Sequence, residues 1–370
     1  MSKKILFFIN GLVGGGKERR FLEFLHYLKQ NTNFKLKVVL TEDEIHYTYV
    51  YNLDIPIIIL KRSVFRKDPF LFYRFYKIAK EFNPDFIHTW GLMTTFYSVP
   101  AKLLLKRPLV SNLIADSNKN YKKWSLSNLF FRIDCIFSDI IISNSKAGLR
   151  AYNLNNFEKK ITIYNGVRLD RFNLKISKNM ILNDIRVDTK FMVIMVASFN
   201  NNKDYDLFLE VASLTCRLRD DVTFVGVGGG PNLEKMQNKI SKEKIHNVIL
   251  TGKRSDVEDL VAISDIGVLF THSEGISNSI IEYMASGKPV ITTDILGGSR
   301  EIIVNNESGF IMERNADSIA MKIKILLEDD NLRKSMGKKG KQIIEKKFNI
   351  TLMGKEYLKV YNRFTKNIDN

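Results

Sequence analysis

Short, continuously apolar segments alternate with amphipathic segments along almost the whole chain. Runs such as 5–10, 191–197 and 222–227 are rich in Ile, Val and Phe and end at glycine or polar residues. Strands that read as unbroken apolar runs are typical of parallel sheets covered by helices on both faces. The predicted fold class is therefore α/β with doubly wound sheets. We expect further strands at 34–40, 55–60, 85–88, 109–114, 138–143, 161–164, 248–251 and 266–270.

The length of the chain and one polar segment predict two domains. A chain of 370 residues is long for a single core. Residues 170–189 are polar and lack a clean hydrophobic period, as expected of a linker. We therefore predict one Rossmann-like domain over residues 1–172 and a second over 173–352. The pattern at 351–364 predicts a final amphipathic helix.

The net charge of +17 is concentrated in the first half of the chain, because residues 1–175 hold 29 Lys and Arg against 14 Asp and Glu. A basic half is expected to meet an acidic partner, unless the composition only reflects a basic proteome. Anionic lipid, a lipid-linked diphosphate and nucleic acid all have the required charge. The aromatic and basic run at 65–74 favours an anionic membrane surface.

Two further features concern the location of the protein. No apolar stretch approaches the roughly 20 residues that span a bilayer. The two cysteines, Cys135 and Cys216, lie far apart, which argues against a disulfide framework or a zinc site. We expect a cytoplasmic protein, held peripherally on the inner face of the cell membrane.

Two glutamates eight residues apart, Glu274 and Glu282, form the most informative motif. The first is followed by Gly275, which lets the backbone turn close to a ligand. Ser277 or Asn278 can cap a helix that carries Glu282 on its second turn. Helix N-termini bind anions such as diphosphates, and a nearby carboxylate can accept hydrogen bonds from sugar hydroxyls. The motif therefore predicts a site for a phosphorylated sugar.

Other polar positions follow predicted strands, where open α/β sheets bind ligands. Gly15 and Gly16 open the first predicted helix and allow its amides to approach a phosphate. Their spacing fits neither a dinucleotide-binding fingerprint nor a P-loop, and a plain turn explains them equally well. Lys203 follows the strand at 191–197, although a solvated charge is the alternative.

In combination, these segments resemble the retaining glycosyltransferases of family 4, which have the GT-B fold of two Rossmann-like domains facing across a cleft. The resemblance centres on the E-x7-E motif from Glu274 to Glu282 and extends over nearly the whole chain. It implies that the first domain binds the acceptor and the second binds a nucleotide-sugar donor. It also implies that the last helix, residues 353–370, packs back onto the first domain.

The resemblance implies a role for each site residue and needs no metal or other cofactor. Glu282 would bind the ribose, Glu274 would face the donor sugar as a catalytic-site residue, and Lys203 would neutralise the departing diphosphate. We expect UDP as the nucleotide. The remaining donor-site candidates are Gly15, Gly16, Ser198, Lys253, Arg254, Gly275, Ile276, Ser277 and Asn278.

Two positions depart from the family pattern. Ser198 stands where members often place a second cation for the diphosphate, and Ile114 stands where members often have His or Arg. His88, at the end of a predicted strand, is the catalytic candidate that could replace the missing imidazole. A hydrogen-bonded structural histidine is the alternative interpretation of His88.

These inferences predict a hexosyltransferase that moves a sugar from a nucleotide sugar to a glycan or lipid-linked glycan in surface polysaccharide synthesis, such as lipopolysaccharide or capsule. Its transition state would resemble an oxocarbenium ion, with negative charge growing on the diphosphate. A non-hydrolysing nucleotide-sugar epimerase of the same fold is one alternative. A nucleic-acid-binding protein is another, but the chain has no recognisable motif for that role, so we expect no nucleic acid partner.

Overall fold

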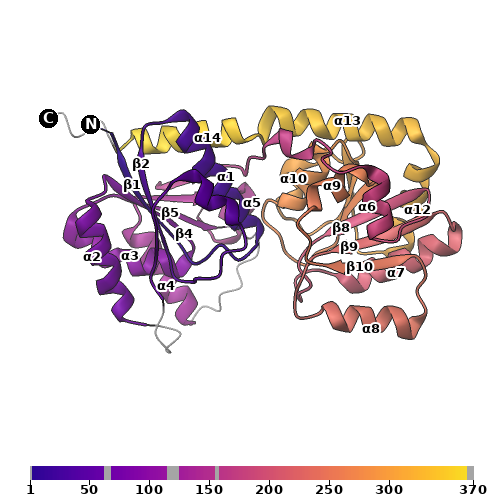
Figure 1. Ribbon diagram of the computed structural model, residues 1–370, viewed down its shortest axis with the longest axis horizontal. Helices are drawn as coiled ribbons and strands as arrows, with labels where there is room; N and C mark the ends of the chain where they lie inside the picture. The colour runs from indigo at the N-terminus through magenta and orange to yellow at the C-terminus, as the bar shows by residue number, and fades with distance from the viewer. Residues whose placement is uncertain (1, 62–67, 115–124, 155–157, 365–370) are drawn as a thin grey trace. The chain divides into compact units, whose positions relative to one another are not determined.

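The computed structural model describes residues 2–61, 68–114, 125–154 and 158–364. The chain forms two compact units, each built around one parallel sheet (Figure 1). Unit 1 contains Met1–Gly166 and Ile350–Asn370, and unit 2 contains Val167–Asn349. Unit 2 is therefore continuous in sequence, whereas unit 1 is completed by the C-terminal segment.

The sheet of unit 1 has the strand order β3-β2-β1-β4-β5-β6-β7. Because the order reverses between β1 and β4, the carboxyl ends of these two strands form a topological switch point, where such sheets bind ligands. The strands are β1 (Lys4–Ile9), β2 (Lys35–Leu40), β3 (Ile57–Ile59), β4 (Phe86–Trp90), β5 (Leu109–Ile114), β6 (Ile140–Ser143) and β7 (Lys160–Thr162). The helices are α1 (Gly16–Asn31), η1 (Thr48–Leu53), α2 (Phe70–Phe82), α3 (Leu92–Leu105), α4 (Leu126–Phe137), α5 (Lys146–Ala151) and α14 (Ile350–Asn362).

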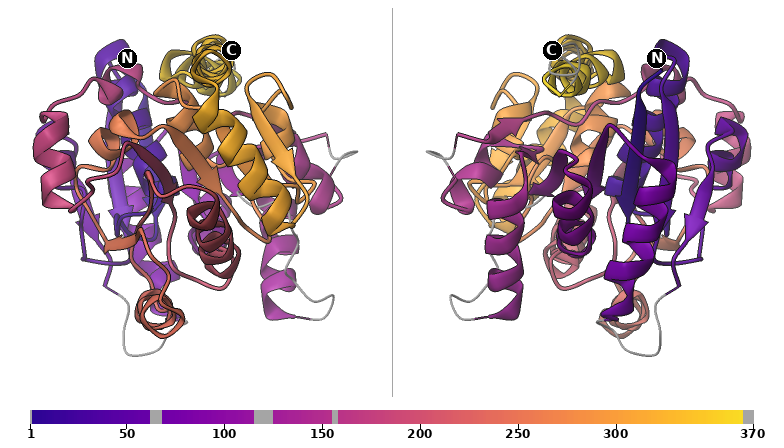
Figure 2. Two further views of the ribbon diagram at one scale, coloured as in Figure 1. Left: turned by 90° about the vertical axis from the view of Figure 1, so that its right-hand side faces the viewer. Right: turned by 90° about the vertical axis from the view of Figure 1, so that its left-hand side faces the viewer.

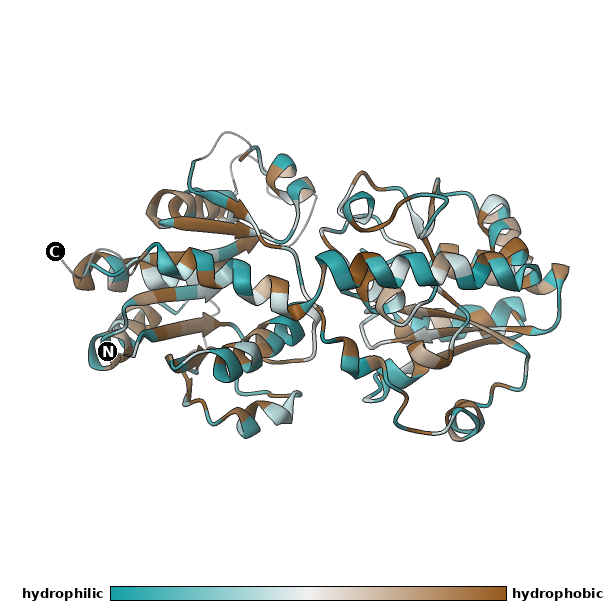
Figure 3. Ribbon diagram, turned by 90° about the horizontal axis from the view of Figure 1, so that it is seen from above, coloured by the Kyte–Doolittle hydropathy of each residue, from teal (hydrophilic) through white to brown (hydrophobic). Residues whose placement is uncertain are grey.

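Helices cover both faces of this sheet (Figures 1 and 2). Alternate side chains of a strand point to opposite faces. Phe7 of β1 packs in a core with residues of α1 and α14, whereas Phe8 packs in a second core with residues of α2 and α3. This arrangement explains the unbroken apolar sequence of β1, and strands drawn largely in brown can be seen in the hydropathy view (Figure 3).

The sheet of unit 2 has the strand order β10-β9-β8-β11-β12-β13, with its switch point between β8 and β11. The strands are β8 (Phe191–Val196), β9 (Val222–Val227), β10 (Val248–Gly252), β11 (Ile266–Leu269), β12 (Val290–Thr293) and β13 (Gly309–Met312). The helices are η2 (Leu169–Phe172), α6 (Lys178–Asp184), α7 (Tyr205–Leu218), α8 (Leu233–Glu243), α9 (Val257–Ile263), α10 (Asn278–Ala285), α11 (Ser299–Ile302), α12 (Ala316–Glu328) and α13 (Asp330–Lys347).

The segment 170–189, expected to be a linker, is folded. It contains η2 and α6, both of which contact α9 within unit 2. The contacts are partly polar, since the Lys175 amide donates to Asp259 Oδ1 at 2.8 Å. These elements place the division at residues 166 and 349, a few residues before the expected boundaries at 172 and 352.

Helix α10, which carries Glu282, has the predicted ends. Ser277 is its N-cap and accepts a hydrogen bond from the amide of Ile280 at 3.5 Å. Gly287 follows the helix with φ +69°, a conformation that suits glycine. In the part of the chain that the structure describes, no helix combines the length and apolar character needed to cross a bilayer.

Candidate active site

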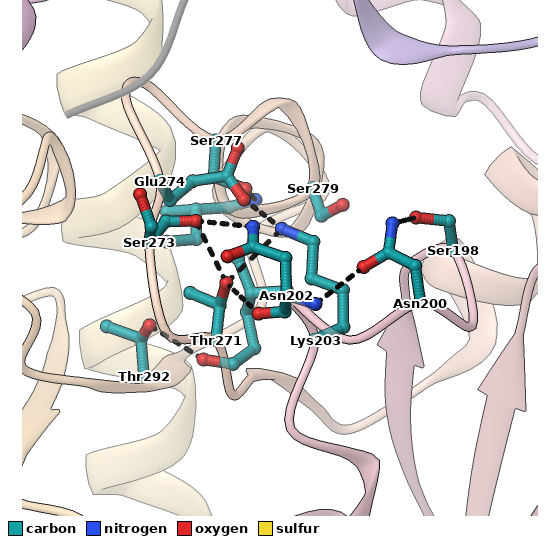
Figure 4. A network of polar contacts seen from close by, with 12 residues as sticks. Ser198, Asn200, Asn202, Lys203, Thr271, Ser273, Glu274, Ser277, Ser279 and Thr292 are labelled. Carbon is teal, nitrogen blue, oxygen red and sulfur yellow. Dashed lines mark hydrogen bonds and ion pairs between the residues drawn. The ribbon is translucent and has the colours of Figure 1, made fainter. Parts of the chain in front are cut away.

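Lys203 and Glu274 meet in unit 2, beyond the carboxyl ends of the neighbouring strands β8 and β11 (Figure 4). The Lys203 ammonium donates to the Glu274 carboxylate and lies 3.5 Å from Thr271 Oγ1. The side chains of Lys203 and Glu274 are 13% and 23% exposed, so the pair is largely shielded from solvent. Two residues that the sequence placed in the donor site therefore form one ion pair at the switch point.

Hydrogen bonds hold together the two loops that carry this pair. Asn202 Nδ2 donates to the Ser273 carbonyl at 2.7 Å, and Thr271 Oγ1 donates to the Asn202 carbonyl at 2.9 Å (Figure 4). Asn202 was not among the predicted site residues, because its role is to bind a backbone carbonyl that the sequence does not reveal. The bonds fix Lys203 relative to Glu274 and reduce the entropy that ordering them would cost on ligand binding.

The residues from Gly275 to Asn278 lead directly into α10. A helix N-terminus attracts anions through its dipole and its backbone amides, so this segment suits the approach of a phosphate. Ser279 Oγ donates to the Val196 carbonyl at 2.6 Å, which ties the start of α10 to the end of β8. A Cβ built on Gly298 would lie 2.3 Å from the Gly275 oxygen, so glycine at 298 permits this close approach of two loops.

Glu282 lies on the second turn of α10 and is only 3% exposed. Arg171 Nη1 lies 4.0 Å from Glu282 Oε1, and the same guanidinium forms an ion pair with Glu258 of α9. A buried carboxylate is costly unless a positive charge or hydrogen bonds compensate it. Arg171 supplies such a charge, but it was not predicted as a site residue because it lies in the segment expected to be a linker.

The other candidates of unit 2 occupy the loops after β8 and β10. Ser198 is exposed and accepts a hydrogen bond from Asn200 Nδ2 at 2.8 Å. Lys253 is exposed, and its side chain lies against Gly229, where a Cβ would come within 2.7 Å of Lys253 Cγ.

Arg254 differs from its neighbour, because its guanidinium is held by Asp256 and Asp184, each at 2.7 Å. The Asp256 hydrogen bond in particular raises the pKa of Arg254 above its ordinary value. Two carboxylates therefore already balance its charge.

Gly15 and Gly16 begin α1 in unit 1, immediately beyond the carboxyl end of β1. Gly15 is the N-cap residue, and its carbonyl accepts a hydrogen bond from Tyr47 Oη at 3.2 Å. The structure thus places these glycines in the connection that follows β1 at the switch point of the unit 1 sheet, a position that suits either a phosphate-binding turn or a plain turn.

His88 does not lie at the end of a strand, because β4 continues to Trp90. Its side chain is fully buried, with Nδ1 2.7 Å from Tyr361 Oη and Nε2 3.2 Å from Asn112 Oδ1. Burial lowers the pKa of His88 to about 3, although the Asn112 hydrogen bond opposes the shift, so the ring is neutral at pH 7. These contacts favour the alternative interpretation of His88, a hydrogen-bonded structural histidine that joins α14 to the sheet.

Among the residues that the structure describes, no group of three or more His, Cys, Asp and Glu side chains could hold a metal ion. The site in unit 2 brings together one ammonium group, two carboxylates and the start of a helix. This set of groups suits a ligand that carries both hydroxyls and a diphosphate.

Comparisons with known proteins cover both units. A family model described as "Glycosyltransferase Family 4" matches residues 14–171, and one described as "Glycosyl transferases group 1" matches residues 181–343. A relative from Campylobacter jejuni, N,N'-diacetylbacillosaminyl-diphospho-undecaprenol alpha-1,3-N-acetylgalactosaminyltransferase, is 28% identical over 90% of this chain and 92% of its own. A second, from the same organism, is N-acetylgalactosamine-N,N'-diacetylbacillosaminyl-diphospho-undecaprenol 4-alpha-N-acetylgalactosaminyltransferase, 27% identical over 92% of this chain and 94% of its own.

Among solved structures, Anabaena HepE in complex with UDP and glucose is similar to this chain. The TM-score is 0.85 at 19% sequence identity, over 97% of this chain and 99% of the other. This likeness confirms the predicted fold, two doubly wound parallel sheets of the GT-B class.

Proposed function

The chain belongs to the glycosyltransferases of family 4, and from this we propose that it is a retaining enzyme that transfers a sugar from a UDP-sugar to a lipid-linked glycan. The family establishes that the reaction is glycosyl transfer. The donor, the stereochemistry and the acceptor are the parts that we infer.

The contact between Lys203 and Glu274 beside α10 carries the proposal. It places a cation, a carboxylate and the N-terminus of a helix at one switch point. In the donor complex, Lys203 turns from Glu274 toward the diphosphate, and Glu274 accepts hydrogen bonds from sugar hydroxyls. Glu282, buried eight residues further on, accepts hydrogen bonds from the ribose.

The mechanism follows from where charge develops. Breaking the bond between the anomeric carbon and the diphosphate leaves negative charge on the phosphate oxygen and positive charge on the sugar ring. Lys203 and the first amides of α10 stabilise the negative charge. The acceptor hydroxyl attacks from the same face and gives its proton to the departing phosphate, so the configuration is retained and no carboxylate nucleophile is needed.

We infer that the reaction is independent of metal ions, because these fixed positive groups do the work that a divalent cation does in other transferases. Activity in a chelator such as EDTA should match activity with added Mg²⁺ or Mn²⁺. Loss of turnover in the chelator that either ion restores would contradict this part of the proposal.

The acceptor is inferred from the relatives and from charge. Both Campylobacter relatives are named for acceptors linked to diphospho-undecaprenol. A lipid diphosphate in an anionic bilayer matches the basic excess of residues 1–175. We therefore place the enzyme at the cytoplasmic face of the membrane, acting in the assembly of a surface polysaccharide.

A thermal-shift panel of nucleotide sugars tests the donor site. A bound donor stabilises the protein by about 2.7 kcal/mol at a hundredfold excess over Kd. We expect UDP-sugars to raise the Tm, Glu282→Ala to abolish the increase, and Glu274→Gln to reduce discrimination between sugars more than UDP binding. Glu234→Gln, at an exposed position of α8, is the matched control. The donor assignment fails if no nucleotide sugar raises the Tm of the unaltered chain.

A further inference from the structure

Three helices on one face of the unit 1 sheet carry a continuous row of aromatic rings. Helices α2, α3 and α4 lie side by side on this face of the sheet (Figures 1 and 2). Phe96 of α3 stands between Phe72 of α2, at 5.2 Å between ring centroids, and Phe130 of α4, at 4.4 Å. The partly buried row therefore links all three helices.

Large apolar side chains extend from both ends of this row into solvent. Phe70 and Tyr73 in the first turn of α2 are 71% and 61% exposed, and Leu126 and Leu129 in the first turn of α4 are 58% and 51% exposed. We call these four residues the helix-start patch. Isolated exposed apolar residues are ordinary, but several that flank a partly buried aromatic row mark an interaction surface.

The helix-start patch lies at the edge of unit 1 where acceptors are expected. A helix that connects parallel strands begins near their carboxyl ends, so the first turns of α2 and α4 share the sheet edge with Gly15 and Gly16. A partner bound to the patch therefore lies beside the switch point of this sheet.

The charges around the patch are mainly positive. Lys77 of α2, whose ammonium lies 5.8 Å from the centre of the Tyr73 ring, and Arg132 of α4 are exposed. The acidic residues of the same three helices are Glu81, which is exposed, and Asp134, which is fully buried. Apolar side chains flanked by lysine and arginine fit the boundary between anionic headgroups and acyl chains.

We propose that the helix-start patch docks unit 1 on an anionic lipid bilayer. The four apolar side chains enter the boundary between headgroups and acyl chains, and Lys77 and Arg132 face the headgroups. This inference rests on the proposed function, since an enzyme that uses a lipid-linked acceptor must meet it at the bilayer. Residues 65–67 of the basic and aromatic run lie outside the described residues and are not needed for the argument.

Flotation with lipid vesicles tests the proposal on the full-length chain. We expect binding to vesicles of phosphatidylglycerol and phosphatidylcholine, and little binding to phosphatidylcholine alone. Phe70→Ser combined with Leu129→Ser should weaken binding at least about tenfold, because two inserted side chains are lost. Lys77→Glu combined with Arg132→Glu should remove most of the salt-sensitive part of the binding.

Tyr51→Ser combined with Leu352→Ser is the matched control. Both residues are exposed, and they belong to η1 and α14, which contribute to the core on the α1 side of the sheet. We expect this variant to bind vesicles like the unaltered chain.

Three results would overturn the proposal. The first is no binding to anionic vesicles, and the second is an equal loss of vesicle binding in the patch and control variants. The third is that the unaltered chain is a dimer and the patch variant is a monomer that still binds vesicles. The last result would assign the patch to a second copy of the chain. The increase in Tm that UDP-sugars cause, measured on the same samples, distinguishes a failure of the docking proposal from a failure of the donor-site proposal. A patch variant that loses vesicle binding but keeps the donor-induced Tm increase supports docking, whereas absence of that increase in every sample overturns only the donor site.

Discussion

Arg171 stands between two carboxylates of unit 2 and determines how much it costs to bury Glu282. Replacing it with glutamine leaves Glu258 and Glu282 without their shared positive charge. Breaking a buried ion pair typically costs about 3–5 kcal/mol, so we expect Arg171→Gln to lower the free energy of unfolding by about 3 kcal/mol. If Glu282 binds the ribose equally in the ground and transition states, KM for the donor rises while kcat changes little.

Two other variants make this prediction specific. Arg171→Lys keeps the charge and should recover part of the donor affinity. Arg168→Gln removes a neighbouring guanidinium that pairs with the exposed Asp170, so it should change stability by less than about 1 kcal/mol. Denaturant unfolding and steady-state kinetics measure both quantities. Equal behaviour of the variants at 168 and 171 would show that Arg171 does not position Glu282.

Asp134 of α4 is a buried carboxyl group whose two oxygens have no hydrogen-bond partner among the described residues. Burial raises the pKa of Asp134 to about 9. An unfolded chain loses this proton near pH 4, so between about pH 4 and pH 9 the folded protein holds a proton that the unfolded chain has released. The contribution to stability is complete below pH 4 and is lost as the pH rises, by about 1.4 kcal/mol per unit.

Asp134→Asn removes this titration while keeping a similar shape. At pH 7 the variant should therefore be more stable than the unaltered chain by up to about 4 kcal/mol, whereas near pH 4 the two should be alike. Urea unfolding followed from pH 4 to pH 9 measures the difference. A difference that does not vary with pH would mean that Asp134 is ionised in the folded protein.

At the scale of elements, α14 depends on one close contact with α1. A Cβ built on Gly354 would lie 2.1 Å from Tyr27 Cε1, and Tyr27 is itself buried. Gly354→Ala should therefore separate the two helices and lower the free energy of unfolding by about 1–3 kcal/mol, in spite of the better helix propensity of alanine.

Gly340→Ala in α13 is the matched control for this prediction. Its added Cβ would meet the flexible Met284 side chain at 3.3 Å, so the expected change is within about 1 kcal/mol. Thermal unfolding of both variants provides the comparison. If Gly354→Ala is as stable as Gly340→Ala, Tyr27 can move and the packing of α14 on α1 is looser than the structure indicates.

The elements that the sequence predicted well are those with local signals. β1, β8 and β9 are unbroken apolar runs, and α10 is marked by Ser277 at its start and Gly287 after its end. Helix α6 was missed because it has only seven residues and only one of them, Ile181, is buried, which is too little to show a hydrophobic period.

The residues of the candidate site also fall into those that a local sequence signal marks and those that only a long-range contact places. Lys203 and Glu274 could be placed together because both follow strands at a switch point. The position of Arg171 depends on η2 folding against α9, and the burial of His88 depends on Tyr361, 273 residues away in α14. Neither long-range contact leaves a local pattern, so sequence reasoning placed His88 at a ligand site and overlooked Arg171.

At the scale of the whole molecule, the chain enters and leaves unit 2 at one place. The Val167 amide donates to the Phe348 carbonyl at 2.8 Å, and Val167 pairs with Asn349 in an isolated bridge. Unit 2 therefore closes on itself within residues 167–349, whereas unit 1 needs the segment after residue 349 to supply α14. The two units should respond differently to loss of that segment.

Removal of residues 350–370 should destabilise unit 1 and leave unit 2 intact. The loss of α14 exposes the apolar residues of α1 that pack against it and takes Tyr361 from the buried His88 ring. Burial of large side chains such as Tyr357 and Tyr361 contributes about 1.5–3 kcal/mol each, a large share of the stability of a domain. Hydrogen exchange read by mass spectrometry should show faster exchange in β1, β4 and α1 and unchanged protection in β8, β9 and α10. Equal loss of protection in both units would instead mean that they unfold as a single cooperative structure.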